Sequence, residues 1–191
     1  LMRAYHYFQL VRMFGDVPYT EKKLNVDDED VLYGSRTNRD EVMDKVLEDL
    51  NFAAANINVT NYSINKWSRD MANAMKADIC LWEGTFRKYR NAADGQPTAD
   101  AAGAKKFLEA CKEACQHIMA RDYSLSSSYQ ANYNSTSLTS NYEIIFAKEY
   151  MQNVLMHSLI AYTSSSTQMS GMSKDAFESY LMADGKPMGL S

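Results

Sequence analysis

Apolar residues recur every three or four positions in several stretches of the chain, which is the spacing of one helix face. The strongest stretch runs through Val42, Val46, Leu50, Ala53 and Ile57. Similar spacing fills residues 1–14, the segment from Ser68 to just before Asp94, and residues 100–121. Four helices joined by modest loops predict a mainly α fold of antiparallel helix pairs.

Polar residues and glycine mark where these helices begin and end. Gly15 and Pro18 stop the first helix. We predict Thr37 as the N-cap of the second, because Asp40 follows three residues later as in a capping box, and Ser173 as the cap of a last short helix. Leu1 opens directly into helix pattern without a capping residue, so we expect further sequence upstream.

The character of the chain changes after Tyr123. Residues 124–141 are rich in Ser, Thr, Asn, Gln and Tyr with almost no charge, which is typical of a loop. Residues 142–149 hold a short apolar run that predicts an extended segment. We therefore divide the chain into a helical region, 1–123, and a loop-rich part, 124–191.

Composition and charge exclude several function classes. The chain is 46% hydrophobic and 23% charged with a net charge of −4, and its basic residues are scattered, so nucleic acid is not an expected partner. The sequence has no phosphate-binding loop, His-rich metal motif or nucleophile elbow. Asp44 and Glu48 are paired carboxylates, but Arg39 and Lys45 nearby favour a solvated charged face. We expect no enzyme activity and no cofactor.

Three cysteines, Cys80, Cys111 and Cys115, leave two interpretations open. Cys111 and Cys115 would share a helix face, which suggests a metal site with His117. However, His117 lies about 200° around the helix from Cys115. The favoured interpretation is three small apolar core residues and no metal site.

Two long motifs resemble one protein family. Residues 1–18 (LMRAYHYFQLVRMFGDVP) resemble the "LRAYYYFxLVxxFGDVP" element of the SusD/RagB family, and residues 36–54 resemble its "RTSRDEVYxxIxxDLxxAA" helix. Residues 72–82, 143–146 and 173–187 are similar to the family's Ala-rich helix, its "EIIF" strand and its "DGKP" segment. Trp67-Ser68 and Asp78 depart from the pattern, which weakens transfer of individual residue roles.

The resemblance implies a stack of degenerate TPR-like helix pairs that supports an irregular lobe containing a short strand. It also implies an internal part of a longer lipoprotein on the outer surface of the outer membrane in Bacteroidota. There the family delivers oligosaccharide to a SusC-like TonB-dependent transporter and hydrolyses nothing. A lipid anchor outside this segment would be its link to the membrane.

The loops have the composition that sugar binding requires: aromatic rings for the C–H face and amides for the hydroxyls. The candidate ligand-binding residues are Tyr150, Gln152, Asn153, Tyr162 and Gln168. The alternative is that these tyrosines pin an irregular loop to the helices. The tyrosines of the first helix and Trp82 are expected in the core, with Tyr5 and Tyr7 donating buried hydrogen bonds. A TPR-like protein-interaction scaffold, and capture of peptide or glycopeptide, stay open as alternative functions.

Overall fold

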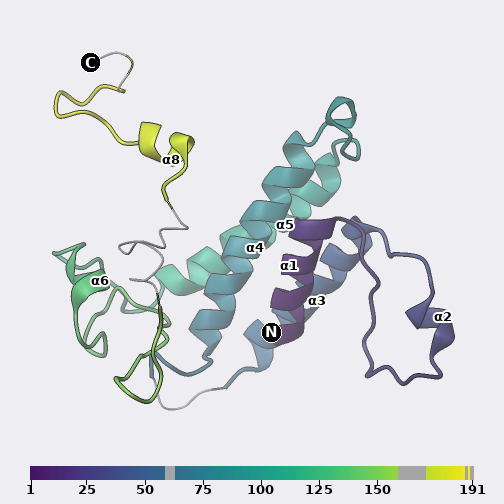
Figure 1. The fold of residues 1–191 in the computed structure, drawn as a ribbon, viewed down its shortest axis with the longest axis horizontal. Helices are drawn as coiled ribbons and strands as arrows, with labels where there is room; N and C mark the ends of the chain where they lie inside the picture. Colours follow the sequence, from purple (N-terminus) through teal and green to yellow (C-terminus); the bar gives the residue numbers. More distant parts are fainter. Residues whose placement is uncertain (59–62, 159–170, 188, 190–191) are drawn as a thin grey trace. The chain divides into compact units, whose positions relative to one another are not determined.

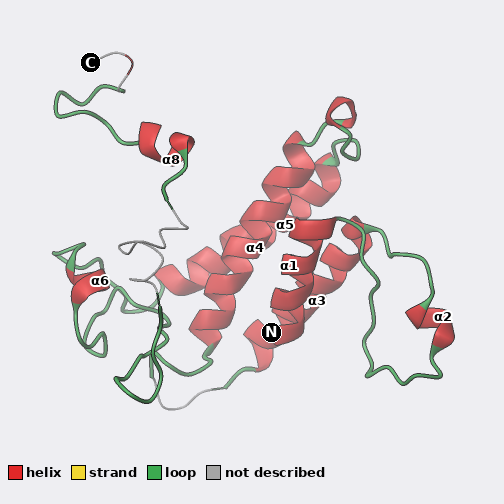
Figure 2. Ribbon diagram, in the orientation of Figure 1, coloured by secondary structure: helices red, strands yellow, loops and turns green. Residues whose placement is uncertain are grey.

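The computed structural model describes residues 1–58, 63–158, 171–187 and 189. The chain divides into two compact units, Leu1–Lys148 and Glu149–Ser191. The helices of the first unit are α1 (Met2–Phe14), α2 (Glu29–Leu32), α3 (Arg39–Asn56), α4 (Arg69–Tyr89), the 3-10 turn η1 (Ala92–Asp94), α5 (Ala101–Met119) and α6 (Ala131–Asn134) (Figure 1). The second unit contains α8 (Lys174–Glu178). Helices dominate and strands are absent from the described residues, which confirms the mainly α fold class (Figure 2).

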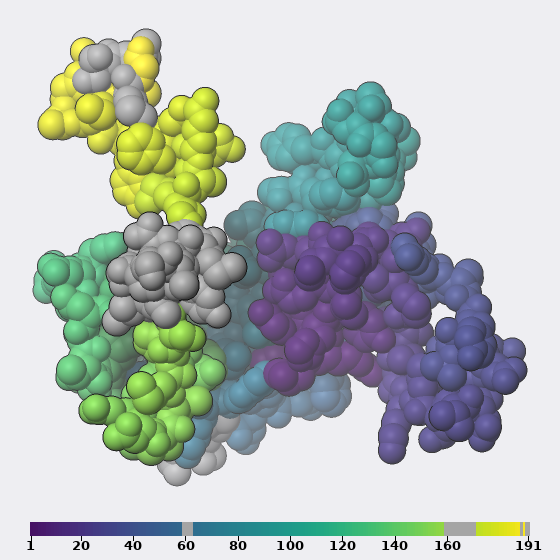
Figure 3. Space-filling model, viewed as in Figure 1, coloured from purple at the N-terminus to yellow at the C-terminus, as the bar shows by residue number. Residues whose placement is uncertain are grey.

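The four long helices of the first unit pack as successive antiparallel neighbours. Helix α3 contacts both α1 and α4, and α4 packs along α5. The direction follows from end-to-end contacts: the Arg39 amide at the start of α3 donates to Asp16, just after the end of α1, at 2.8 Å. In the same way the Asp100 amide before α5 donates to the Arg87 carbonyl near the end of α4. The segment that carries α2 extends away from these helices (Figure 3).

Side chains of all four helices form one hydrophobic core. Its largest fully buried members include Phe107, Met43, Leu50 and Ile79. Helices α4 and α5 approach closely at Gly84, where an added Cβ would lie 2.7 Å from Leu108 Cγ. Only a residue without a side chain fits between the two helices at this level.

One of the two predicted helix caps is confirmed and the other is wrong. Ser68, Asp100 and Ser173 each accept a backbone N–H of the first helical turn, which confirms the cap at Ser173 and the helix starts predicted near Ser68 and Asp100. The prediction of Thr37 as a cap is wrong: Asn38 caps α3 through the Asp40 amide. The amide of Thr37 instead donates to the Val17 carbonyl in an isolated β-bridge.

The start of α3 and the end of α4 share a group of charged side chains inside the unit. We call Arg39, Asp40, Glu83, Arg87 and Arg90 the buried charge cluster. Glu83 is fully buried and accepts hydrogen bonds from Arg39 and Arg87, the latter at 2.6 Å from Nε. Asp40 accepts from Arg39 at 2.6 Å and from both terminal nitrogens of Arg90 at 2.7 and 2.8 Å. The prediction that Arg39 belongs to a solvated face is therefore wrong.

Opposite charges compensate for the burial of this cluster. Burial alone would raise the pKa of Asp40, but the hydrogen bonds from Arg90 and the charges of Arg87, Arg90 and Arg39 outweigh it and lower the pKa. Arg87 also donates to Asp44 at 3.0 Å and to Asp100 at 3.2 Å. The cluster thus ties α3 and α4 to the start of α5.

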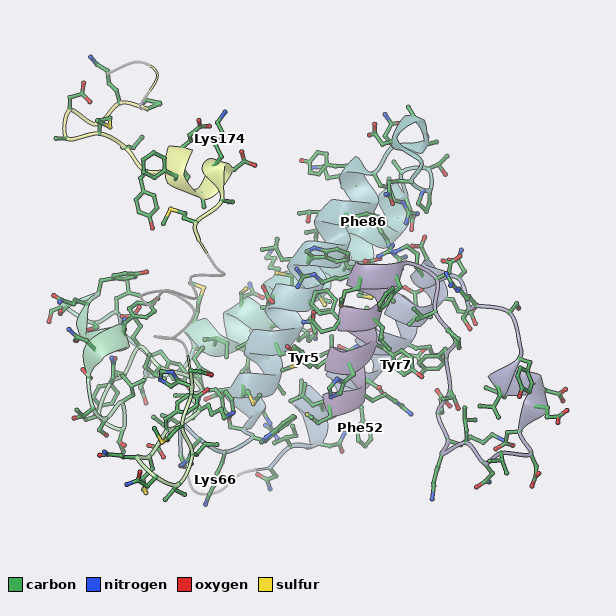
Figure 4. The ribbon with its side chains drawn as sticks, viewed as in Figure 1. Tyr5, Tyr7, Phe52, Lys66, Phe86 and Lys174 are labelled. Carbon is green, nitrogen blue, oxygen red and sulfur yellow. The ribbon has the colours of Figure 1, made fainter. Side chains whose placement is uncertain are left out.

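The aromatic residues of α1 and α4 are less deeply buried than predicted. Tyr5 is exposed, and Tyr7 is half-buried, with a hydroxyl that donates to the Thr20 carbonyl and accepts from the Thr20 amide. Figure 4 shows these two side chains on opposite sides of α1. Trp82 is half-buried and stacks on Phe86 at 5.4 Å. Residues two apart on a helix face nearly opposite ways, so Tyr5 and Tyr7 cannot both enter the core.

Two further predictions are corrected within the described residues. Cys80 is buried and Cys111 half-buried, but Cys115 is exposed on α5, so it is not a core residue. Residues 143–146 adopt turn and irregular backbone instead of the expected strand, and the next residue, Ala147, donates a backbone hydrogen bond to the Ile64 carbonyl. This bond holds the loop-rich segment against the turn before α4.

The second unit consists of short local structures. A tight turn joins Met151 and Leu155 through reciprocal backbone hydrogen bonds of 3.0 Å. Helix α8 follows its Ser173 cap, and a second turn pairs Leu181 with Pro187 around Gly185, whose φ of 76° suits glycine. Whether the chain divides functionally at residue 123 stays a prediction. Among the described residues, no helix has the length and apolarity needed to span a bilayer.

Candidate functional site

Three of the five predicted ligand-binding residues lie together on the turn of the second unit. Tyr150 is half-exposed and meets His157 edge to face, with ring centroids 4.8 Å apart. Gln152 and Asn153 are exposed in the turn that follows, and Asn153 adopts a left-handed φ of 62°. Tyr162 and Gln168 lie outside the described residues. Ligand binding by all five stays a prediction.

A second group of polar and aromatic residues lies in the first unit, where the loop after α5 folds back on itself. The backbone amide of Ser126 donates to Glu143 at 2.7 Å, and the Asn141 side chain donates to Asn132 at 2.6 Å. The Ser124 amide donates to the carbonyl of Tyr142 at 3.2 Å. These bonds fix the backbone around Tyr142 and leave its ring 70% exposed.

Two pockets adjoin this residue. The first, of about 330 Å³, is lined by Asp70, Arg121, Asp122, Tyr123, Thr139, Ser140, Asn141 and Tyr142. The second measures about 390 Å³ and is lined mainly by serine hydroxyls of residues 124–140. Ser140, Asn141 and Tyr142 line both pockets. We call the two pockets together the Tyr142 site.

The buried end of the first pocket is organised by Asp70 in the first turn of α4. Its carboxylate accepts the Tyr123 hydroxyl at 2.9 Å and the Arg121 Nε at 3.3 Å, and it lies 3.1 Å from His117 Nε2. Burial alone would raise the pKa of Asp70, but the hydrogen bonds from Tyr123 and His117 and the charge of Arg121 lower it overall. Asp70 therefore stays ionised and orients these three side chains.

A pair of exposed tyrosines lies on the same loop. The rings of Tyr129 and Tyr133 are 5.0 Å apart with an interplanar angle of 50°. Both are about three-quarters exposed, at 75% and 74%. Tyr129 and Tyr133 line neither pocket, whereas the exposed ring of Tyr142 lies beside hydroxyl, amide, carboxylate and guanidinium groups of the first pocket. This combination suits a sugar, which offers C–H faces and hydroxyls.

Sequence reasoning placed ligand binding in the loop-rich part but did not select these residues. Tyr142 belongs to the tyrosine-rich region and carried no signal that set it apart from Tyr150. Asp70 and Arg121 were read only as parts of helices. The available signal was the acidic residue in the first turn of α4, a position that favours negative charge.

The described residues contain no group of three His, Cys, Asp or Glu side chains that could hold a metal ion. His117, which might have joined Cys111 and Cys115, contacts Asp70 instead. The arrangement supports binding by hydrogen bonds and ring contacts.

Comparison with known proteins finds similarity to one family over the first 81 residues. Residues 1–81 match the SusD-like family, described as starch-binding and associating with the outer membrane. SusD-like protein P2 of Formosa agariphila is 34% identical over 86 residues, which cover 45% of this chain and 17% of that protein. No solved structure matches the chain.

Both comparisons point to the same class of protein, the SusD-like proteins. The motifs agree with the two comparisons, so residues 1–81 are a SusD-like segment.

Proposed function

We propose that the protein captures oligosaccharide at the cell surface and delivers it to a SusC-like TonB-dependent transporter in the outer membrane. The observation that carries the proposal is the Tyr142 site, in which two pockets of sugar-accommodating size share an exposed aromatic ring. The family description, starch-binding and outer-membrane associating, agrees with a glycan ligand. In this function no bond is made or broken.

Affinity electrophoresis of the intact protein through gels containing single polysaccharides tests the ligand class. We expect retardation by at least one neutral glycan, and a weaker effect in Tyr142→Ala. An aromatic contact contributes about 1 kcal/mol, which corresponds to about fivefold in affinity. Tyr33→Ala is the matched control, because Tyr33 is 84% exposed but lies beside α2, outside the pockets.

The same experiment compares the two candidate loops. Tyr150→Ala and Tyr162→Ala test the residues chosen from sequence. A loss confined to these variants, with Tyr142→Ala unchanged, would place capture on the second unit and refute the Tyr142 site.

The main alternative is a TPR-like scaffold that binds protein through its helices. Its support is the run of antiparallel helices α1, α3, α4 and α5. Unchanged mobility across a broad glycan panel would favour this alternative. Retardation by glycopeptide but not by glycan would favour the same pockets acting on a peptide ligand.

Delivery requires the transporter and the outer membrane. We propose surface exposure of the full-length protein through a lipid anchor, and expect a TonB-dependent transporter to co-purify with it from detergent-solubilised outer membranes. Recovery from the soluble fraction, without a transporter, would contradict this part of the proposal.

A further inference from the structure

A third pocket, of about 700 Å³, lies on the helices rather than on the loops. Helix α3 contributes Asn51, helix α4 contributes Arg69, Asn73 and Lys76, and helix α5 contributes Glu113 and His117 among its lining residues. It shares no lining residue with the two pockets of the Tyr142 site. Its volume falls within the range of pockets that bind small molecules.

Lys76 is the unusual member of this pocket, because its ammonium group is charged and buried. The residue is only 4% exposed, and its Nζ donates to Glu113 Oε2 at 2.8 Å. An ammonium has three N–H donors. Within the described part of the chain, Glu113 is the acceptor that the structure gives it. A buried charge with so few acceptors is costly, so Lys76 has capacity for a further anionic partner.

Glu113 is a weak partner for such a charge. Its side chain is 76% exposed, so water competes for its carboxylate and little holds it in place. The rim adds a second cation, Arg69, whose guanidinium makes a long contact of 3.5 Å to the Ala55 carbonyl within the described residues. The Nε2 atom of His117 lies 3.1 Å from Asp70 Oδ1. The pocket thus contains two permanent cations and one exposed carboxylate, in a chain whose net charge is −4.

We propose that this pocket binds the anionic group of a small ligand, a carboxylate or a sulfate, with Lys76 as its charge partner and with Glu113 displaced towards solvent. Asn51 and Asn73 offer amide groups to the rest of a sugar-sized molecule. The site goes beyond neutral glycan capture at the Tyr142 site and does not require it. The anionic group has two possible sources, an acidic sugar or a free inorganic ion, which share this chemistry.

Isothermal titration of the intact protein at constant ionic strength tests the proposal with glucuronate, inorganic sulfate and neutral glucose. We expect glucuronate or sulfate to bind at this pocket. Glucose should not displace the bound anion from it. Binding of glucuronate alone assigns an acidic sugar, and binding of sulfate alone assigns a free anion. Lys76→Gln removes a charged hydrogen bond and should weaken binding about 10- to 100-fold.

Glu113→Gln gives the distinguishing result. It removes the carboxylate that competes for Lys76 and should strengthen anion binding about threefold. If the Lys76–Glu113 ion pair has only a structural role, anion binding to this variant should be absent or weaker. Glu109→Gln is the charge-matched control, since Glu109 lies one turn earlier on α5 and lines a different pocket. If Lys76→Gln fails to fold, Arg69→Gln replaces it.

Absence of binding for both anions, or binding that persists unchanged in Lys76→Gln and Arg69→Gln, would overturn the proposal. Tyr142→Ala should leave anion binding unchanged. The Tyr142→Ala variant therefore tests the two proposals independently, because anion binding at the Lys76 pocket and glycan binding at the Tyr142 site can each be lost without the other.

Discussion

Glu83 is the residue on which the buried charge cluster depends most. Replacement by Gln keeps the shape of the side chain but removes its charge. Arg39 and Arg87 then lose their shared carboxylate, which lies 3.1 Å from Arg39 Nη1 and 2.6 Å from Arg87 Nε. The two guanidinium groups stay buried next to each other, with less compensating charge.

The expected magnitude follows from burial. Removing one partner of a buried ion pair costs about 3–5 kcal/mol. Arg39 retains Asp40 at 2.6 Å and Arg87 retains Asp44 at 3.0 Å, so we expect the lower end, about 3 kcal/mol. This is a large part of the stability of a typical domain, about 5–15 kcal/mol.

Urea unfolding of the intact protein, followed by helical circular dichroism, measures the effect. With a slope of about 1–3 kcal/mol per molar urea, Glu83→Gln should lower the midpoint by about 1–3 M. Glu48→Gln is the control, because Glu48 forms an exposed ion pair with Lys45 at 3.0 Å and should change the midpoint little. Equal midpoints for the two variants would refute the reasoning.

Three further predictions address single residues. Burial raises the pKa of Cys80 to about 12, while Cys115 is exposed. A thiol reagent should therefore modify Cys115 in the native protein and Cys80 only after unfolding. Equal modification of the two in peptide mass spectrometry would contradict this. The folded-state pKa of Asp70 lies below its ordinary 3.8, so its ionised form stabilises the protein above that pH, and this contribution is lost as pH falls through the folded-state pKa. Tyr123→Phe removes a hydrogen bond to Asp70 and should cost about 1 kcal/mol at neutral pH and move acid unfolding to higher pH; an unchanged acid transition would contradict this. Gly103→Ala would normally favour a helix by about 0.5–1 kcal/mol. Its Cβ, however, would clash with the capping carboxylate of Asp100 and lie 2.5 Å from the buried Arg87 Nη1, so the melting temperature should fall, and a rise would contradict this.

Features that depend on neighbouring residues could be predicted from the sequence. The spacing of Val42, Val46 and Leu50 identified α3, and all three are buried. Ser173 was recognised as a cap because a cap bonds to an amide only two or three residues away. Thr37 and Asn38 can both cap a helix, and the choice was made by a contact 20 positions away, between Thr37 and Val17. Local pattern could not contain that information.

The Tyr142 site was beyond prediction for a related reason. Its pocket joins Asp70 to Tyr123, which is 53 positions away in the sequence. The composition of the loops indicated the kind of ligand, since Ser, Asn and Tyr are the groups that suit a sugar. It could not indicate which tyrosine lies beside a buried carboxylate, because that depends on how α5 returns along α4.

The buried charge cluster also could not be predicted from local sequence, because one charge spacing occurs both on exposed and on buried helix faces. Glu83 and Arg87 have the i,i+4 spacing of an exposed ion pair, and so do Lys174 and Glu178, which form one at 3.6 Å. Burial separates the two cases: Glu83 is fully buried because α4 is covered by α3 on one side and by α5 on another. A charge placed between three helices needs a partner from a neighbouring helix, and Arg39, 44 positions away, supplies it. The charge pattern of a helix can therefore be interpreted only when the helices that flank it are known.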